Sequence, residues 1–397
     1  MTGRSLTFYE FFAGGGMARA GLGADWTCLF ANDMDPDKAA SYRANWGGRD
    51  FVGGDLAAVP QDALPGRADL AWASFPCQDL SLAGGGKGMG GAEDAIRTRS
   101  GAFWLFHDKM RFLHGQSRAP RAIVLENVVG VLSSHGKRDF QAIVAALDAL
   151  DYRVGALVLD ARLFTPQSRP RVFFVALAKP SIATLGRTGG LQVGEAPDPH
   201  WTPPSLIAAQ ASLSPDLVER WIWWRLPQPA LRNIHLEDVL EDSPADAPWR
   251  APAATASLLD LMAPAHREKI RQLQESGTRR IGAVYRRTRV DENGIKRQRA
   301  EVRFDGMAGC LRTPGGGSSR QTLLEVCGGT IRSRLLSPRE AARLMGLPES
   351  YVLPANATKA YGLCGDGLCV PAVRHLAAHL LAPLLRAVPA DTLAAAE

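Results

Sequence analysis

Residues 6–22, LTFYEFFAGGGMARAGL, place an apolar run directly before a glycine-rich turn and a helical pattern. Residues 6–12 are typical of a buried strand, and the glycines that follow open a helix around residues 18–21. A second buried strand is predicted at residues 27–32. Strands and helices in this alternation predict a mostly parallel sheet with helices on both faces.

The alternation continues as far as Lys179. Apolar runs predict four further strands, at residues 69–74, 122–125, 156–159 and 172–177. A helix is expected at residues 140–150, which have helical spacing. The N-terminal part of the chain is therefore assigned to the α/β fold class.

The composition changes after Lys179. Residues 180–265 are rich in proline, alanine and serine, and residues 279–303 are strongly basic. This basic segment holds three acids against nine cations, namely Arg279, Arg280, Arg286, Arg287, Arg289, Lys296, Arg297, Arg299 and Arg303. Most of the chain's net positive charge is explained there.

A helical pattern returns near the C-terminus. Ser337 is a candidate N-cap, with Pro338 at the first helical position. We expect three parts: an α/β domain at 1–179, an irregular basic region at 180–330, and a C-terminal segment at 331–397 that returns to the first domain.

Composition excludes several classes of protein. The chain has 397 residues, of which 46% are hydrophobic, and its 46 Lys and Arg exceed its 40 Asp and Glu, so a polyanionic partner is plausible. The six cysteines form no CxxC pair and no Cys/His set with zinc spacing, so no metal is expected. We find no secretory signal and no run of about 18 apolar residues, so we expect no membrane partner and a cytoplasmic location with reduced thiols.

The glycine-rich turn is a candidate nucleoside site. Glycines at a strand-to-helix turn let a ligand approach the backbone closely. Asp33 follows the second strand, where a carboxylate can bind ribose hydroxyls, and Asp55 could contact an adenine amino group. A strict dinucleotide fingerprint needs glycine at position 19, where this chain has Arg19. The alternative is a tight turn without a ligand.

Reactive side chains lie at the ends of three later strands. Cys77 follows the strand expected at residues 69–74, Glu126 ends the next one, and Arg169 and Arg171 precede the strand expected at residues 172–177. A thiol at the carboxyl edge of such a sheet is a candidate nucleophile. Taken singly, the cysteine could be a small core residue and the arginines could form a surface salt bridge.

These segments resemble the DNA cytosine-5 methyltransferases. FFAGGG, PCQ, ENV and QSRPR are similar to the family's first, nucleophile, base-binding and paired-arginine motifs. Residues 334–351 and 361–371 are similar to its last two motifs, in the family's order. The resemblance covers residues 6–179 and about 306–385. It implies a Rossmann-like class I methyltransferase domain with a smaller, irregular target-recognition domain.

The resemblance also implies the reaction. Attack of the Cys77 thiolate on C6 of cytosine would make C5 nucleophilic enough to accept a methyl group from S-adenosylmethionine. Glu126 would hydrogen-bond N3 of the base, and Arg171, with Arg169, would hold O2 and the segment around Cys77. The base must leave the duplex for this chemistry, and residues 84–91 are similar to a lid over it.

The expected contacts follow from the same motifs. For the cofactor they are Phe12, Ala13, Gly14, Gly16, Asp33, Met34, Asp55, Leu56 and Pro76. For duplex DNA they are Gln78, Gln167, Arg286, Arg287, Arg289, Arg312, Ser318, Ser319 and Arg320, since cations hold phosphates and residues 312–321 resemble a recognition loop.

Some features depart from the family or leave alternatives. Asp366 stands where the last motif normally has asparagine, and we expect it to make a structural hydrogen bond within its own turn. An RNA cytosine-5 methyltransferase on the same fold and an inactive DNA-binding homologue are the alternative functions. We expect a monomer in the cytoplasm, associated with the nucleoid in a prokaryote; the sequence leaves open a separately acting restriction endonuclease.

Overall fold

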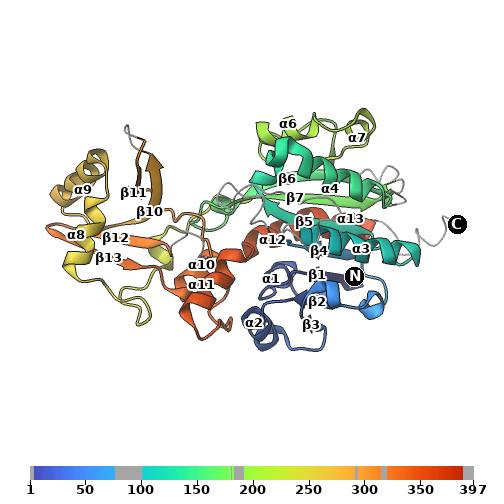
Figure 1. The fold of residues 1–397 in the computed structure, drawn as a ribbon, viewed down its shortest axis with the longest axis horizontal. Coiled ribbons are helices and arrows are strands. Elements are labelled where there is room, and N and C mark those ends of the chain that lie inside the picture. The colour runs from blue at the N-terminus through green and yellow to red at the C-terminus, as the bar shows by residue number, and fades with distance from the viewer. Residues whose placement is uncertain are drawn as a thin grey trace. The chain divides into compact units, whose positions relative to one another are not determined.

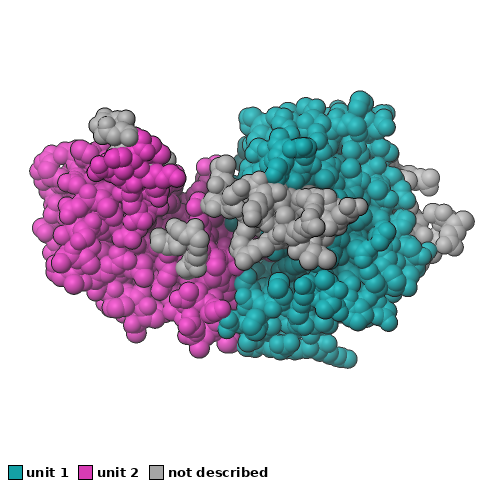
Figure 2. Space-filling view, viewed as in Figure 1, with its two compact units in different colours: residues 1–160, 170–230, 372–397 teal, residues 161–169, 231–371 magenta. Residues whose placement is uncertain are grey.

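The chain forms two compact units in a computed structural model (Figure 2). The structure describes residues 4–76, 101–179, 181–182, 192–290, 294–313 and 320–387, with only the backbone described for Arg289. The first unit comprises residues 1–160, 170–230 and 372–397, and the second comprises residues 161–169 and 231–371. These divisions differ from the boundaries expected at 179/180 and 330/331, because residues 192–230 pack with the first unit and residues 331–371 with the second.

The first unit is built on a seven-stranded sheet in the order β3-β2-β1-β4-β5-β7-β6 (Figure 1). Strands β1 to β5 pair in parallel, and β7 is antiparallel to both its neighbours. The strands are β1 (Leu6–Phe11), β2 (Trp26–Asp33), β3 (Phe51–Gly53), β4 (Leu70–Ala73), β5 (Ala122–Val128), β6 (Tyr152–Asp160) and β7 (Pro170–Ala178). The mostly parallel sheet predicted from the sequence is confirmed.

Helices connect the parallel strands. They are α1 (Met17–Leu22), α2 (Pro36–Trp46), α3 (Ala102–Gly115) and α4 (Arg138–Asp148). The helices expected at residues 18–21 and 140–150 are α1 and α4. Asp35 caps α2 by accepting hydrogen bonds from the backbone of Asp37 and Lys38, so this helix begins directly after the strand end that carries Asp33.

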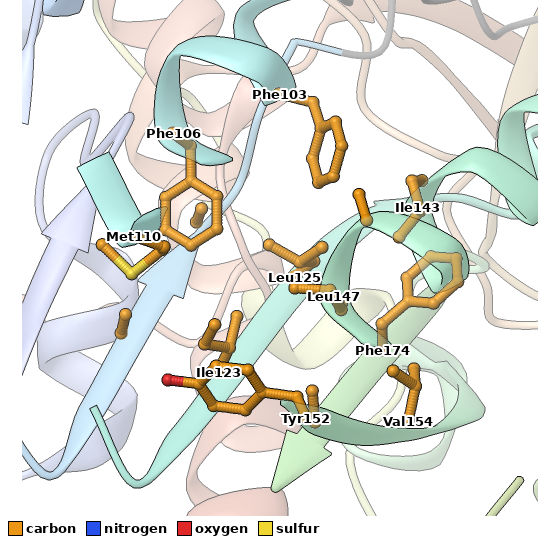
Figure 3. Packing of buried hydrophobic residues seen from close by; sticks show 14 of the residues in the cluster. Phe103, Phe106, Met110, Ile123, Leu125, Ile143, Leu147, Tyr152, Val154 and Phe174 are labelled. Atoms are coloured by element: carbon orange, nitrogen blue, oxygen red, sulfur yellow. The ribbon is translucent and has the colours of Figure 1, made fainter. Parts of the chain in front are cut away.

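A hydrophobic core joins α3 and α4 to one face of the sheet (Figure 3). Phe103 and Phe106 of α3 and Ile143 of α4 pack in one cluster with Ile123 and Leu125 of β5. All five are fully buried, and each such side chain contributes roughly 1.5–3 kcal/mol on burial. This core holds the carboxyl end of β5, where Glu126 lies, in a fixed position.

The region after β7 adds short elements to the first unit. Trp224 donates a hydrogen bond from Nε1 to the carbonyl of Val175, and Trp221 packs against Phe140. Gly155 is required because a Cβ there would lie 2.1 Å from the carbonyl oxygen of Ile222. This packing explains why residues 192–230 belong to the first unit. The elements are β8 (Val193–Gly194), α6 (Pro204–Gln210), α7 (Pro215–Glu219) and β9 (Trp223–Trp224).

The C-terminal helices also return to the first unit. The elements are α12 (Val370–Leu376), the π-helical turn η9 (Ala377–Leu381) and α13 (Ala382–Ala387). The turn η9 contacts α1, and Arg121, paired with Asp69, donates a hydrogen bond to the carbonyl of Leu385. Among the described residues, Ala357–Ala387 is long and apolar enough to cross a membrane, but 67% of its most apolar window is buried, as in a core helix.

The second unit contains a four-stranded antiparallel sheet in the order β11-β10-β12-β13. It is more regular than the sequence suggested, because apolar side chains from the sheet and two helices form a small core of their own. The strands are β10 (Arg280–Val290), β11 (Lys296–Arg303), β12 (Thr322–Cys327) and β13 (Thr330–Leu335). The helices are α8 (Pro252–Asp260), α9 (Pro264–Ser276), α10 (Pro338–Leu344) and α11 (Ala357–Asp366).

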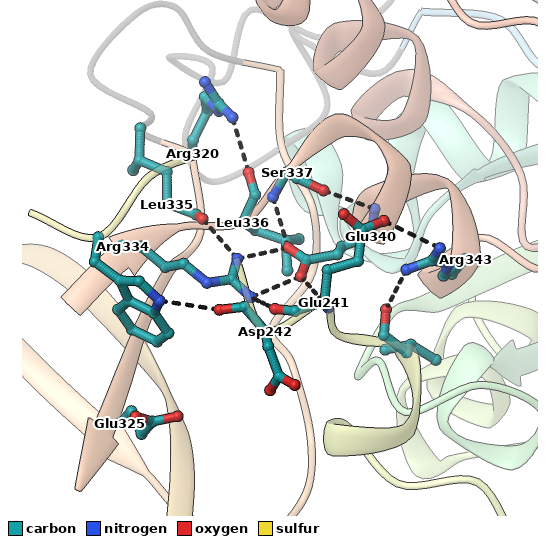
Figure 4. Close-up of polar contacts among 12 residues, drawn as sticks. Glu241, Asp242, Arg320, Glu325, Arg334, Leu335, Leu336, Ser337, Glu340 and Arg343 are labelled. Carbon is teal, nitrogen blue, oxygen red and sulfur yellow. Dashed lines mark hydrogen bonds and ion pairs between the residues drawn. The ribbon is translucent and has the colours of Figure 1, made fainter. Parts of the chain in front are cut away.

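A buried ion pair joins β13 to α10 (Figure 4). Arg334 and Glu340 are 1% and 0% exposed and lie 2.7 Å apart. Ser337 and Glu340 form a capping box at the start of α10, as the predicted N-cap suggested. The Glu340 carboxylate also accepts a hydrogen bond from the backbone of Glu241, which fixes the chain entering the second unit.

Candidate active site

The glycine-rich turn between β1 and α1 is attached to the end of β2. The Asp33 carboxylate accepts hydrogen bonds from the backbone amides of Gly14, at 2.7 Å, and Asp35, at 2.8 Å. Phe12, Gly14 and Gly16 all have positive φ angles, of 56°, 56° and 80°. The turn is therefore an unusual backbone conformation, which the Asp33 carboxylate helps to hold together with the backbone of Asn32 and the indole of Trp46.

Two of these glycines serve different purposes. A Cβ on Gly16 would lie 2.3 Å from Nε1 of Trp46 in α2. This close packing is by itself a sufficient reason for glycine at position 16. A Cβ on Gly14 would meet nothing within 4 Å. The backbone at Gly14 thus faces open space, as a close approach by a ligand requires.

The end of β2 places a buried carboxylate next to an exposed apolar side chain. Burial raises the pKa of Asp33 above its ordinary value, while the Lys38 charge and the two backbone hydrogen bonds oppose that rise. Met34, the next residue, is 69% exposed. Asp55 is exposed and caps the short helix that contains the buried Leu56.

Arg19 and Glu10 are part of this region, and the sequence predicted a structural role for neither. Arg19 forms an ion pair with Asp50 and a hydrogen bond with Tyr42, which explains an arginine where a dinucleotide fingerprint has glycine. Glu10 is buried and accepts a hydrogen bond from the backbone of Arg19 in α1. Burial raises the pKa of Glu10 to about 8, although this hydrogen bond opposes the rise. Its only sequence signal was an acidic residue inside an apolar strand.

Glu126 and Arg171 form an ion pair at the end of the sheet. The Nε atom of Arg171 lies 3.1 Å from Oε1 of Glu126, and the two side chains are 14% and 9% exposed. In the antiparallel ladder Glu126 is opposite Phe173, so Arg171 is two residues further along on the same face. The pair therefore follows directly from the register of β5 and β7.

Asn127 connects this pair to the segment that leads to Cys77. Its side-chain amide donates a hydrogen bond of 3.1 Å to the carbonyl of Phe75, two residues before Cys77. Asn127 is the middle residue of the ENV motif, and the sequence alone did not indicate this structural role. Pro76 is half-buried, whereas Cys77, Gln78 and residues 84–91 lie outside the described residues.

Arg169 and Gln167 are placed differently from Arg171. Both belong to the second unit and are buried, at 2% and 0% exposure. Gln167 accepts a hydrogen bond from the backbone of Leu311 and donates one to the carbonyl of Leu344. The amide group of Gln167 is thus buried and bonded on both sides. The expected contact of Gln167 with DNA stays a prediction.

The other expected DNA contacts have mixed surroundings. Arg286, Arg287 and Arg312 are exposed. Arg320 is half-buried, donates a hydrogen bond to the carbonyl of Leu336 and lies over the Tyr361 ring at 5.5 Å. The side chains of Arg289, Ser318 and Ser319 lie outside the described part of the structure.

The hairpin formed by β10 and β11 concentrates positive charge. Arg287 is opposite Arg299, and Arg297 lies two residues before Arg299 on the same strand, so these three arginines share one face of the ladder. One acid, Glu301, lies 3.6 Å from Arg287. Like charges in directly opposed positions are destabilising, so this face is suited to a polyanion that compensates them.

Asp366 ends α11 in the second unit. It is exposed and accepts a hydrogen bond from the hydroxyl of Thr313. This bond joins Asp366 to a segment 53 residues away. The hydrogen bond expected within its own turn stays a prediction.

Asp366→Asn should therefore change the affinity for S-adenosylmethionine by less than about tenfold, or about 1.4 kcal/mol. An asparagine oxygen can still accept the bond from Thr313. Calorimetric titration of the cofactor into both proteins measures this, and a larger change in either direction would show that Asp366 tunes the cofactor site.

The sheet order, the turn after β1 and the carboxylate after β2 define a Rossmann-like methyltransferase. The C-5 cytosine-specific DNA methylase family matches residues 6–382. The chain therefore belongs to this family and is a DNA cytosine-5 methyltransferase.

Known relatives agree with this assignment, and solved structures share the fold. Type II methyltransferase M.NlaX of Neisseria lactamica is 26% identical over 94% of this chain and 96% of its own length. Type II methyltransferase M.HhaI of Haemophilus parahaemolyticus is 25% identical over 94% and 93%. The S. pombe Dnmt2 methyltransferase shares the fold with a TM-score of 0.56 and 15% identity, over 96% of this chain and 99% of that one. The Entamoeba histolytica methyltransferase EhMeth has a TM-score of 0.57 and 13% identity, over 94% and 97%.

Proposed function

We propose that this chain methylates C5 of cytosine within a specific sequence of duplex DNA, through a covalent bond between Cys77 and C6 of a flipped-out base. The observation that supports it most is the Glu126–Arg171 pair, which sits beside the chain leading to Cys77. Both groups are nearly buried, and charge–charge interactions are stronger in such surroundings than in water because the effective dielectric constant is lower.

The turn after β1 would hold S-adenosylmethionine, which supplies the methyl group in this family. Gly14 leaves space beside the backbone, Asp33 has lone pairs left for ribose hydroxyls, and the exposed Met34 offers an apolar surface to the adenine. Phe12, Ala13, Asp55, Leu56 and Pro76 would complete the walls, while Gly16 contributes through its packing against Trp46.

The residues at the sheet edge would divide the work on the base. A thiolate at Cys77 adds to C6, and the electron density pushed into the ring is stabilised at N3 by a hydrogen bond from protonated Glu126. Arg171 donates to O2 and keeps the Glu126 carboxyl in place through the contact already described. C5 would then take the methyl group that S-adenosylmethionine supplies, with S-adenosylhomocysteine as the leaving group. Loss of the C5 proton to water and of Cys77 as a thiolate would release the methylated base.

The decisive experiment identifies the base and its context. The purified enzyme is incubated with S-adenosylmethionine and either genomic DNA or total RNA, and bisulfite sequencing then maps 5-methylcytosine in each. We expect methylation of DNA in one short sequence. Methylation confined to RNA would support an RNA cytosine-5 methyltransferase instead, and binding without methylation would support an inactive DNA-binding homologue.

Replacing Arg286, Arg287 and Arg289 together by alanine should reduce the salt dependence of DNA binding. Each lost phosphate contact should lower the slope of log affinity against log salt by roughly 0.9. Fluorescence anisotropy at several salt concentrations measures the slope, and cofactor affinity should stay unchanged. Arg271→Ala is a matched control, because Arg271 is exposed but already paired with Glu268 and Glu275. An unchanged slope in the triple variant would mean that the hairpin is only a solvated face.

We also propose that the enzyme acts as a monomer in the cytoplasm, associated with the nucleoid. A restriction endonuclease of the same specificity would act as a separate protein. Type II methyltransferases among the relatives are the basis for this proposal.

A further inference from the structure

We propose that Arg169 is a positioning residue that, together with α11, fixes both described ends of the segment expected to read the DNA sequence. The segment is residues 312–321. It is held at residues 310–313, which lead into it and form its first described part, and at residues 320–321, where it ends. The inference rests on the proposed function for its consequence in DNA recognition, whereas the arrangement itself is contained within the second unit.

The guanidinium of Arg169 is engaged by four acceptors from two distant parts of the chain. One terminal nitrogen donates to the carbonyl of Leu311 at 2.9 Å and contacts the Cys310 sulfur at 3.4 Å. The other donates to the carbonyls of Gly365 at 2.9 Å and Gly367 at 2.7 Å. The four N–H groups on the two terminal nitrogens are thereby directed at the protein, with 2% of the residue exposed.

The residues just before Arg169 hold the same segment from the backbone side. Ala308 donates a backbone hydrogen bond to Pro166 and accepts one from Ser168. Gln167 then accepts the amide of Leu311 through its side chain. Residues 166–169 and 308–311 therefore run together as a short, bonded pair of segments.

The helix α11 meets both ends of the recognition segment. At its C-terminal end a Cβ on Gly365 would lie 2.7 Å from the backbone nitrogen of Thr313, so only glycine permits this approach. Further back along α11, the buried Tyr361 hydroxyl accepts a hydrogen bond of 2.8 Å from the backbone of Gln321. Arg320 stacks over the same ring and bonds to the carbonyl of Leu336 (Figure 4).

This geometry separates Arg169 from its neighbour Arg171. Arg171 pairs with a carboxylate at the sheet edge and has a role on the base, whereas Arg169 binds carbonyls that belong to no substrate. A planar guanidinium can donate from each of its two terminal nitrogens to a separate pair of acceptors. A lysine ammonium presents all its donors from one nitrogen. Arg169→Lys should therefore keep the charge and lose the bridge.

The test compares Arg169→Lys with Arg162→Lys, a matched control at an exposed arginine of the same 161–169 segment. Hydrogen exchange is measured on the holoenzyme, and we expect the peptides covering residues 308–313 to exchange at least about tenfold faster only in Arg169→Lys. This readout needs no catalytic activity. Unchanged protection would overturn the proposal.

The second readout is methylation of a duplex pool with randomised sequence. Arg169→Lys should raise KM for DNA and broaden the methylated sequence, and KM should change by a larger factor than kcat. The melting temperature should fall, because buried carbonyls lose their hydrogen bonds. A fall in kcat with unaltered KM and sequence preference would assign Arg169 to the base and overturn the proposal. If the wild type methylates no DNA, the proposed function fails. The hydrogen-exchange measurement would still show whether Arg169 holds residues 310–313 in place.

Tyr361→Phe tests the other end of the segment if Arg169→Lys fails to fold. It removes one buried acceptor, that of the Gln321 amide, and keeps the ring beneath Arg320. Faster exchange in peptides covering residues 320–322, with a broadened target sequence, is expected. Wild-type exchange and an unaltered target sequence would contradict the role of α11.

Discussion

Cys77→Ser should abolish methyl transfer while leaving DNA binding largely intact. A serine hydroxyl is far less acidic than a thiol and supplies almost no anion at neutral pH, so the attack on C6 fails. Cysteine and serine are close in size, so the substitution should not disturb the fold. The hydrogen bond from Asn127 to the carbonyl of Phe75 does not involve the side chain at position 77. Tritium transfer from labelled S-adenosylmethionine to duplex DNA and a gel-shift assay measure the two properties separately.

A trapping experiment makes this first prediction specific. A duplex with 5-fluorocytosine at the target position should form a stable covalent adduct with the wild type, because fluorine cannot leave as a cation. Cys77→Ser should form none. An adduct that survives the substitution would show that another residue is the nucleophile.

Glu126→Gln should lower the rate of methyl transfer on the order of 100-fold, as is typical when a general acid–base group is lost. Glutamine keeps the size of the side chain and can still accept the bond from Arg171, but it cannot share a proton with N3 of the base. Single-turnover measurements with saturating DNA report this loss without a contribution from product release.

Two controls separate this effect from a loss of structure. The melting temperature and cofactor affinity of Glu126→Gln should match those of the wild type within a few degrees and a few-fold. Arg171→Lys keeps a positive charge beside Glu126 and should show a smaller loss than Glu126→Gln. Normal turnover in a well-folded Glu126→Gln protein would disprove the role on the base.

The first sheet was predictable because its strands are short apolar runs that end in chemically distinctive residues. Asp33 and Glu126 both lie at strand ends, as the sequence indicated. The Glu126–Arg171 pair could not be predicted in the same way. It depends on the antiparallel register of β5 and β7, which the sequence pattern does not specify.

The roles of Gln167 and Arg169 were not predictable from local sequence. Their partners at Leu311, Gly365 and Gly367 lie 142 to 198 residues away along the chain. A motif shows that arginine is present but not whether its donors meet a substrate or a carbonyl. The regular sheet of the second unit was missed because its strands β10 and β11 are rich in arginine, so their β-pattern is masked by charge.

The chain leaves the first unit after Asp160, re-enters it at Pro170, and crosses again near residues 230 and 371. The short excursion at residues 161–169 carries Gln167 and Arg169, and their side chains bond to Leu311 and Gly365 in the long excursion at 231–371. Anyone grafting target specificity between such enzymes would therefore have to transplant two discontinuous pieces. If only the piece corresponding to residues 231–371 were exchanged, the recipient's glutamine and arginine at positions 167 and 169 would face backbone carbonyls from the donor. The hybrid would then contain the donor's residues proposed to contact DNA, but not the side chains proposed to position them.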